Sequence, residues 1–387
     1  MVKMAAEGKI TYSELEGPID LCLGCRACEV VCPTNVQYGK ILESAKEAIQ
    51  HHKKESKTMT KRAKLFQDFV FDKAIPNNKL LQTAGSGLAL YQKSGLQTVA
   101  RKTRAINLLP GKLRTFEKIL PNVEGPIERR SRKEHYPAKL RPAFRIGFFT
   151  GCIMDTMFSD INTKSIKLLQ EAGCEVTVIK EQTCCGAHQN HSGETEITKK
   201  LAKENIQAFE KYDFDYIVNS IGGCGAQMVE YDKLLADDPE WASRAEEFAR
   251  KSVDISVILG QVKLPFVKEI SKVVTYQPSC HMTNVQKRVQ EPLELLKKIP
   301  GITYMELPQK NMCCGSAGIY NIVNYEAAMD ILDEKMKQVE KVSPEVIVTT
   351  NPGCHLQMKV GVEKEGLSDQ IEVVHIVELL TEACGVE

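Results

Sequence analysis

The stretch Arg145-Ile146-Gly147-Phe148-Phe149-Thr150-Gly151-Cys152 reads as a short buried strand that ends in a cysteine. Further strands are predicted over 175–179 and 216–220, and helices over 161–172 and 198–212. Short apolar strands that alternate with helices are typical of an α/β domain with a parallel sheet.

The second half of the chain repeats the landmarks of this unit. The apolar run Val273-Val274-Thr275-Tyr276 leads to Cys280, as 146–150 leads to Cys152. Two glycine-bearing motifs also recur: Cys184-Cys185-Gly186 as Cys313-Cys314-Gly315, and Gly222-Gly223-Cys224 as Pro352-Gly353-Cys354. The three offsets are 128, 129 and 130 residues, a spacing that indicates two copies of a domain rather than a solenoid. We therefore predict duplicated cysteine-rich α/β domains over 143–263 and 264–387.

Each copy carries four cysteines in three separate turns. The first cysteine set is Cys152, Cys184, Cys185 and Cys224, and the second cysteine set is Cys280, Cys313, Cys314 and Cys354. Ligands bind at the carboxyl ends of strands in open α/β sheets, so we expect each set to bind a cofactor there. The alternative is that these thiols serve as small buried hydrophobes. Cys174 and Cys384 have no counterpart in the other copy, and we expect them to be structural.

A third group of cysteines lies near the N-terminus. The N-terminal run comprises Cys22, Cys25, Cys28 and Cys32 followed by Pro33, in the spacing C-x2-C-x2-C-x3-C-P. This spacing is that of bacterial ferredoxins, which hold a [4Fe–4S] cluster. Zinc is the alternative, but zinc sites usually pair two cysteine knuckles across a longer loop. We predict a small, helical, ferredoxin-like [4Fe–4S] segment over 1–50.

The fourth cysteine of this run has two interpretations. In two-cluster ferredoxins the fourth cysteine of a run ligates the other cluster, and the sequence contains a single run. Either Cys32 completes one site with Cys22, Cys25 and Cys28, or an upstream run is missing. Residues 1–20 resemble the connector between two such runs, which favours the second interpretation.

Residues 51–142 lack cysteine and are predicted to form a basic helical connector. A helix over 61–73 would place Leu65, Phe66, Phe69 and Val70 on one face. Breaks are predicted at Pro76 and at 85–87, and another helix over 96–109. Residues 51–145 hold 22 Lys and Arg against seven Asp and Glu. This excess indicates either a solvated surface or a docking surface for an acidic partner or an anionic membrane; no nucleic-acid-binding motif accompanies it.

Length and composition limit the class of protein. The 387 residues predict two or three domains. The N-terminus has no apolar run typical of a secretory signal, and no stretch of about 18 apolar residues would span a bilayer. We expect a cytoplasmic protein, with peripheral contact to the inner face of the membrane left open. The 14 cysteines would then be reduced, which favours metal ligation over disulfides.

Histidines accompany the cysteine sets. His281 and His355 directly follow candidate ligands, and His188 and His191 lie just after Cys185. They are candidates to donate hydrogen bonds to sulfur or to couple protons to redox chemistry. The alternative is that they are polar turn residues.

The two Cys…Cys-Cys-Gly…Cys sets resemble the paired cysteine-rich domains of several redox subunits. These include subunits of heterodisulfide reductase, anaerobic glycerol-3-phosphate dehydrogenase and lactate-utilisation complexes. The order of segments is most similar to the glycolate oxidase iron–sulfur subunit. The stretches that carry this similarity are 22–29 (Cys-Leu-Gly-Cys-Arg-Ala-Cys-Glu), 91–97 (Tyr-Gln-Lys-Ser-Gly-Leu-Gln), 313–318 (Cys-Cys-Gly-Ser-Ala-Gly) and 351–354 (Asn-Pro-Gly-Cys).

The resemblance implies an electron-transfer subunit without catalytic residues of its own. It implies a partner subunit that bears FAD and oxidises glycolate or lactate, and a quinone or another respiratory acceptor. The sequence contains no G-x-G-x-x-G and no P-loop, which agrees with a flavin bound on another chain. The alternatives are the same relay for L-lactate, another 2-hydroxy acid or glycerol 3-phosphate, a thiol or quinone reductase, and a zinc-stabilised scaffold.

One departure separates this chain from the heterodisulfide reductase type. In that type the last cysteine of a motif extends to C-x-x-C, which gives five thiols. The corresponding positions here are Gln227 and Gln357. Four thiols per set favour electron relay over disulfide cleavage.

Overall fold

Two sheets that share an order of four strands form the centre of the computed structural model, which describes residues 1–56, 60–138 and 141–386; the first sheet has β1 in addition. The order is β1-β3-β2-β4-β5 in the first sheet and β7-β6-β8-β9 in the second. All pairings are parallel except that of β1 with β3. The strands are β1 (His135–Tyr136), β2 (Arg145–Phe148), β3 (Glu175–Val178), β4 (Tyr216–Asn219), β5 (Ser252–Asp254), β6 (Val273–Tyr276), β7 (Thr303–Tyr304), β8 (Val346–Thr349) and β9 (Glu372–His375).

The equal strand order shows that the two halves share one topology. In each half the first strand of the repeat, β2 or β6, pairs on one side with the next strand and on the other with the third, β4 or β8. The strand β1 precedes residue 143 and yet joins the first sheet through β3. The first sheet thus recruits residues from the predicted connector, while the domain limits themselves remain a prediction.

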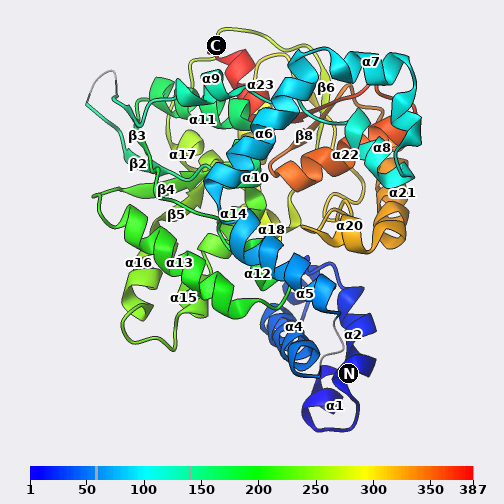
Figure 1. Ribbon diagram of the computed structural model, residues 1–387. Coiled ribbons are helices and arrows are strands. Elements are labelled where there is room, and N and C mark those ends of the chain that lie inside the picture. Colours follow the sequence, from blue (N-terminus) through cyan, green and yellow to red (C-terminus); the bar gives the residue numbers. More distant parts are fainter. Residues whose placement is uncertain (57–59, 139–140, 387) are drawn as a thin grey trace.

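Helices surround both sheets (Figure 1). The first half contains α10 (Ile153–Met157), α11 (Ser159–Glu171), α12 (Ala187–Asn190), α13 (Thr195–Phe209), α14 (Gly222–Met228), α15 (Tyr231–Leu234), α16 (Ala242–Lys251) and α17 (Ile255–Gln261). The second half contains α18 (Cys280–Asn284), α19 (Gln290–Lys298), α20 (Tyr320–Val323), α21 (Tyr325–Val342), α22 (Pro352–Lys364) and α23 (Ile376–Ala383). Strands covered in this way are buried and largely apolar: all four residues of β8 are buried, and three of them are Val or Ile.

The two halves are packed against each other through one continuous core. A single cluster of buried side chains includes Ile146 and Val218 from the first sheet and Val274 and Val348 from the second. The ring of His375 also hydrogen-bonds across the interface, with 3.0 Å from its Nε2 to the carbonyl oxygen of Ser220. Burial of this apolar surface is what stabilises the pair of halves as one body.

The predicted connector is helical. It contains α5 (Lys61–Asp68), the π-helix η1 (Phe69–Ala74), α6 (Asn78–Lys93), α7 (Leu96–Lys102), the 3-10 helix η2 (Ala105–Leu108), α8 (Gly111–Lys118) and α9 (Pro126–Arg130). In Figure 1 α6 runs diagonally across the front of the molecule, from the N-terminal helices toward α7.

The predicted break at 85–87 is wrong, because α6 continues through these residues. Gly85 is instead a packing position: a Cβ there would lie 3.1 Å from the carbonyl oxygen of Thr156 in α10. The absent side chain lets two helices approach closely, and helix packing outweighs the local cost of glycine.

Two other expectations for the connector are also wrong. Leu65, Phe66 and Phe69 were expected on one face of a regular helix over 61–73, but the α-helix ends at Asp68; these three side chains are 69%, 71% and 51% exposed, and Phe71 is buried. The π-helical turn at 69–74 rotates the register, which a regular helical period does not anticipate. The helix expected over 96–109 ends at Lys102, before Arg104 takes a left-handed conformation with φ of 60°.

The N-terminal segment forms a small helical unit at the lower end of the view in Figure 1. Its helices are α1 (Val2–Ala6), α2 (Tyr12–Asp20), α3 (Ala27–Val30) and α4 (Tyr38–Glu55). Leu15 and Ile19 of α2 pack on Leu42, Ala45 and Ile49 of α4. Within the residues that the structure describes, no helix has both the length and the apolar character needed to cross a bilayer.

Candidate functional site: three groups of thiols

Three thiols of the N-terminal run lie close enough to influence one another. Partial burial, followed by the neighbouring thiols of Cys25 and Cys22, raises the pKa of Cys28. The N–H of Gly24 donates to Cys22 Sγ at 3.4 Å, from a backbone with φ of 62° that favours glycine. Amides aimed at sulfur stabilise thiolate, the form that ligates metal.

Cys32 is held within its own turn. Its Sγ lies 3.3 Å from Thr34 Oγ1 and accepts the N–H of Val36 at 3.4 Å. The hydrogen bond with Thr34, followed by the backbone amides, lowers the pKa of Cys32. These contacts favour the thiolate form of Cys32, which is the form that ligates metal.

The first cysteine set lies at the carboxyl ends of β2, β3 and β4, as predicted for ligands of a parallel sheet. The Sγ atoms of Cys152 and Cys184 are 3.6 Å apart. Hydrogen bonding to Cys184, together with burial, raises the pKa of Cys152 well above its usual value. Cys185 in turn contacts both Cys184 and Cys224, so the four thiols form one group.

The second cysteine set repeats this arrangement. Hydrogen bonding to Cys313, together with burial, raises the pKa of Cys280 well above its usual value. Cys314 contacts both Cys313 and Cys354. The structure thus brings together the four residues that the sequence assigned to each set.

In both Cys-Cys-Gly motifs the glycine N–H donates a hydrogen bond to the sulfur of the first cysteine. Gly186 donates its N–H to Cys184 Sγ, and Gly315 donates to Cys313 Sγ, each at 3.4 Å. Both glycines have positive φ, 85° and 90°. At Gly315 a Cβ would also lie 2.6 Å from the carbonyl oxygen of Ala328, so glycine is required there for conformation and for space.

The chemistry of these donors fits an iron–sulfur group. Crowded, buried thiols with raised pKa values hold their protons unless a positive charge replaces them, and iron supplies such a charge when it binds. Thiolate is also the ligand that iron–sulfur clusters prefer. In the ranges 1–56, 60–138 and 141–386, no three Cys, His, Asp or Glu side chains surround a point as ligands of a single metal ion.

The N-terminal run is packed against the second cysteine-rich domain. Asn284 Nδ2 donates to the carbonyl oxygen of Cys25 at 2.8 Å, and the Tyr320 hydroxyl donates to that of Leu21 at 3.3 Å. Burial mainly, with a contribution from Cys280, raises the pKa of Cys25. The run and the second cysteine set are therefore electrostatic neighbours.

The two cysteine sets are joined through Asn351. Its Oδ1 accepts the N–H of Gly223, which precedes Cys224, at 2.9 Å. Its Nδ2 lies 3.8 Å from Cys354 Sγ, within the range of a weak hydrogen bond to sulfur. One amide side chain thus touches the turns that carry both sets.

A partly buried ion-pair cluster holds the N-terminal run on the first cysteine-rich domain. Arg26 donates to both carboxylate oxygens of Glu230, at 2.9 and 2.8 Å, and to Glu29 at 2.9 Å. Glu43 lies nearby: burial, then the charge of Glu230, raises its pKa to about 7, and Arg26 acts in the opposite direction.

Of the four candidate histidines, His281 is in contact with a candidate ligand, with 3.7 Å between its Nδ1 and Cys280 Sγ. Its ring lies 5.1 Å from that of His191. Burial lowers the pKa of His188, His191 and His355, which keeps them neutral at ordinary pH. His355 Nδ1 lies 3.3 Å from Thr349 Oγ1, which is a structural contact rather than a contact with sulfur.

Cys174 and Cys384 lie apart from the three groups. Both belong to the core cluster that joins the halves, and they are 0% and 5% exposed. Burial raises the pKa of each to about 11, so they remain protonated.

Sequence reasoning missed three residues that contribute to these sites: Lys335, Asn351 and Arg26. Lys335 is fully buried in α21, next to Met336, which packs on Cys314 and Cys354. The offset of 130 residues that aligns Cys224 with Cys354 also aligns Lys335 with Asn205, but this register does not show that the lysine is buried. No sequence pattern predicts the contacts of Arg26 with Glu230, because they join segments far apart in the sequence.

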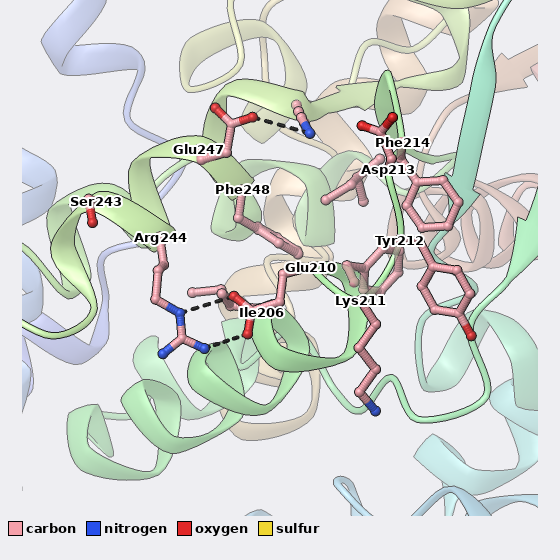
Figure 2. Close-up of a pocket in the computed structure, with 13 residues that line it drawn as sticks. Ile206, Glu210, Lys211, Tyr212, Asp213, Phe214, Ser243, Arg244, Glu247 and Phe248 are labelled. Carbon is pink, nitrogen blue, oxygen red and sulfur yellow. Dashed lines mark hydrogen bonds and ion pairs between the residues drawn. The ribbon is translucent and has the colours of Figure 1, made fainter.

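A cavity of about 570 Å³ in the first half is not part of these sites. Figure 2 shows its lining, with Arg244 paired to Glu210 and with Phe248, Tyr212 and Phe214 around it. Asp213 and Phe214 precede β4, whereas Cys224 follows it, so the cavity lies at the amino end of the sheet. No cysteine lines it.

The duplicated fold and its buried thiol sets define a cysteine-rich redox protein of the iron–sulfur class. A family model described as a cysteine-rich domain matches residues 146–229 and 274–359. A second, described as the linker region of the glycolate oxidase iron–sulfur subunit, matches 62–120. The chain belongs to the family of glycolate oxidase iron–sulfur subunits, which confirms the resemblance in its sequence.

Three individual proteins illustrate the range of similarity. The chain is 46% identical over 392 residues to the probable glycolate oxidase iron–sulfur subunit of Bacillus subtilis (strain 168), with 100% of this chain and 87% of that protein covered. It is 32% identical over 240 residues to lactate utilization protein A of Halalkalibacterium halodurans, covering 61% and 96% respectively. A solved structure of a hypothetical protein from Helicobacter pylori is similar with a TM-score of 0.46 at 10% identity, covering 89% of this chain and 77% of that one.

Proposed function

We propose that this chain relays electrons from an FAD-bearing dehydrogenase subunit to a quinone or another respiratory acceptor. The observation that carries the proposal is the continuity of the three thiol groups. The N-terminal run contacts the second cysteine-rich domain through Asn284 and Tyr320, and Asn351 links the second set to the first. The family assignment supports an oxidoreductase complex, and the chain itself needs no substrate site in this role.

Within this proposal the cysteines are the cluster ligands. Cys22, Cys25 and Cys28 would hold a [4Fe–4S] cluster, with Cys32 as fourth ligand or as a ligand of a second cluster. The two cysteine sets would hold further iron–sulfur clusters through four thiolates each. Such clusters, when bound, accept and release single electrons without the making or breaking of substrate bonds.

The surrounding residues would tune and protect these ligands. The amides of Gly24, Gly186 and Gly315 donate to ligand sulfurs, which stabilises the reduced state. Cys184 and Cys314 are 0% and 1% exposed, so solvent does not reach these two sulfurs directly.

The substrate of the complex is proposed from relatives. Glycolate follows from the name of the relative that matches this chain over its full length. Lactate is the second candidate, because lactate utilization proteins A of several bacteria are 30–34% identical over about 240 residues, which cover 61% of this chain. A relay does not contact the substrate, so this choice rests on the partner subunit.

The connector is the surface we propose for docking of the partner or of the membrane. Leu96 and Leu108 are 58% and 89% exposed beside the cations Arg101, Lys102 and Arg104. An exposed surface that is both basic and apolar suits an acidic protein partner or the inner face of a membrane.

Anaerobic purification of the full chain, followed by iron, sulfide and zinc quantification, tests the proposal. We expect iron and sulfide in similar amounts, and an electron paramagnetic resonance signal of reduced clusters after addition of dithionite. Zinc in place of iron, with no reduced-cluster signal after cluster reconstitution, would overturn the proposal in favour of a scaffold. Turnover of thiols or quinone by the isolated chain would favour a reductase.

A further inference from the structure

The duplicated cysteine sets differ in one buried charge. Helix α13 of the first half and helix α21 of the second begin 130 residues apart, at Thr195 and Tyr325. The same offset places Lys335 where the first half has Asn205. Both side chains are 0% exposed, so the two positions are equivalent in burial and differ in charge.

Asn205 is a neutral support for the first set. Its Oδ1 accepts the N–H of Thr183 at 2.9 Å, and its Nδ2 donates to the carbonyl oxygen of Cys184 at 3.0 Å. These contacts hold the turn that carries Cys184 and bring no charge to it.

Lys335 brings an unpaired cation to the second set. Its Nζ donates to the carbonyl oxygen of Gln309 at 2.9 Å, four residues before Cys313. Among the described residues no carboxylate acts on this ammonium. Burial lowers its pKa to about 8, and the charges that oppose this shift are those of Cys314, Cys313 and Cys354. A buried ammonium without a carboxylate needs another negative partner, and the cysteine set is the group positioned to provide it.

We propose that Lys335 is the buried counter-ion of the second cysteine set and makes that set easier to reduce than the first; this inference rests on the iron–sulfur function proposed above. Reduction adds one negative charge to a set, and a fixed positive charge in a low-dielectric interior stabilises that added charge. The first set, beside Asn205, lacks this stabilisation. The duplicated sites are therefore unequal, and the second holds the electron when one is shared between them.

Asn351 acts in the same direction by an independent contact. Its Nδ2 points to Cys354 Sγ at 3.8 Å, and hydrogen bonds to ligand sulfur favour the reduced state. The equivalent residue of the first half, at the same offset of 130, is Ile221, which has no donor in its side chain.

The test compares charge variants of the full chain by redox titration. Dithionite supplies the electrons and is oxidised to sulfite, and no bond to Lys335 forms or breaks. The signal of the second set is identified by its loss in Cys314→Ser, and that of the first by its loss in Cys185→Ser. Lys335→Met, which keeps length and removes charge, should lower the ratio of reduced to oxidised second set about tenfold at fixed potential, which is about 59 mV for one electron. The first set should keep its potential.

Matched variants separate charge from packing. Lys359→Met removes a half-buried lysine of the same domain that faces Glu378, Glu372 and Asp160, and it should leave both potentials unchanged. Asn205→Lys should move the potential of the first set upward, toward that of the second. If Lys335→Met fails to retain iron, Lys335→Arg must retain it with the wild-type potential.

Two results would overturn the inference. One is an unchanged potential of the second set in Lys335→Met with normal iron content, and the other is loss of iron from both Lys335→Met and Lys335→Arg. Absence of iron and sulfide from the wild-type chain would instead refute the iron–sulfur function itself. Iron content thus distinguishes failure of the inference from failure of the proposed function.

Discussion

Cys25 and Cys174 provide a matched pair at the scale of single residues, since both are cysteines and their surroundings differ. Cys25→Ser should abolish the ferredoxin-type signal of the N-terminal run, because serine replaces a thiolate ligand by a hydroxyl that binds iron poorly. Cys174→Ser should keep all cluster signals and lose about 1–3 kcal/mol of stability, because it buries a hydroxyl in the apolar core. Electron paramagnetic resonance and urea unfolding measure the two effects. An unchanged N-terminal signal in Cys25→Ser would contradict the assignment of ligands.

Glu43 should give the protein a measurable dependence of stability on pH. Its pKa in the folded protein is about 7, against about 4.3 in an unfolded chain. At pH values between these two pKa values the folded state binds more protons than the unfolded state does, so the free energy of unfolding falls as the pH rises toward 7. From about pH 5 to about pH 8 the wild type should lose about 1–3 kcal/mol more than Glu43→Gln. Urea unfolding at both pH values measures this difference, and equal slopes in the two proteins would refute it.

The contact between α4 and the first half can be tested at the scale of elements with two glycines. Gly193 has φ of 77°, and a Cβ there would lie 2.5 Å from the carbonyl oxygen of Lys46 in α4. Gly173 has a similar φ of 86° with nothing within 4 Å of a Cβ. Gly173→Ala should cost about 1–2 kcal/mol for backbone conformation alone. Gly193→Ala should cost about 1–3 kcal/mol more, because it displaces α4. Equal midpoints of urea unfolding in the two variants would show that α4 does not depend on this contact.

The short buried strands were predicted well, whereas the role of Gly85 was not. The strands over 175–179 and 216–220 were predicted to within one residue of β3 and β4, because short apolar runs in a parallel sheet have few other interpretations. Gly85 was taken for a break because sequence alone does not distinguish a glycine that ends a helix from one that admits a neighbouring helix. At the turn of π-helix over 69–74 Phe71 is buried, and its carbonyl oxygen accepts a hydrogen bond from the distant Gln189, a contact that no local pattern encodes.

The candidate ligands of the two sets were predicted as groups, whereas the contacts between groups were not. Duplication fixed the membership of each set through a constant offset. The contact of Asn284 with Cys25 joins residues more than 250 positions apart. The N-terminal run is not duplicated in the sequence, so no repeat could indicate this contact. Lys335 stood in the register of the duplication, but a lysine in an amphipathic helix reads as a solvated residue until its burial is known.

At the scale of the whole molecule, the shared core predicts that the two halves unfold together. Trp241 is the single tryptophan of the chain, and it is buried in the first half, where Arg244 lies 3.8 Å from the centre of its ring. Tryptophan fluorescence therefore reports on the first half, and far-ultraviolet circular dichroism on the entire chain. Urea transitions measured by the two probes should coincide, because Val218 and Val348 belong to one core cluster. Two separated transitions would show that the halves are independent units.

The connector should affect the order in which oxygen damages the three thiol groups. Ile75 and Leu81 of the connector pack on Cys152 and Cys184, so the first set lies beneath a second layer of chain. Cys28, by contrast, is exposed to solvent. Molecular oxygen and chelators reach an exposed thiolate before a covered one, so we expect bleaching to begin at the N-terminal end and to reach the first half last. A cell that repairs damaged subunits would then need to restore iron to the N-terminal run most often, while iron bound by the first cysteine set would persist.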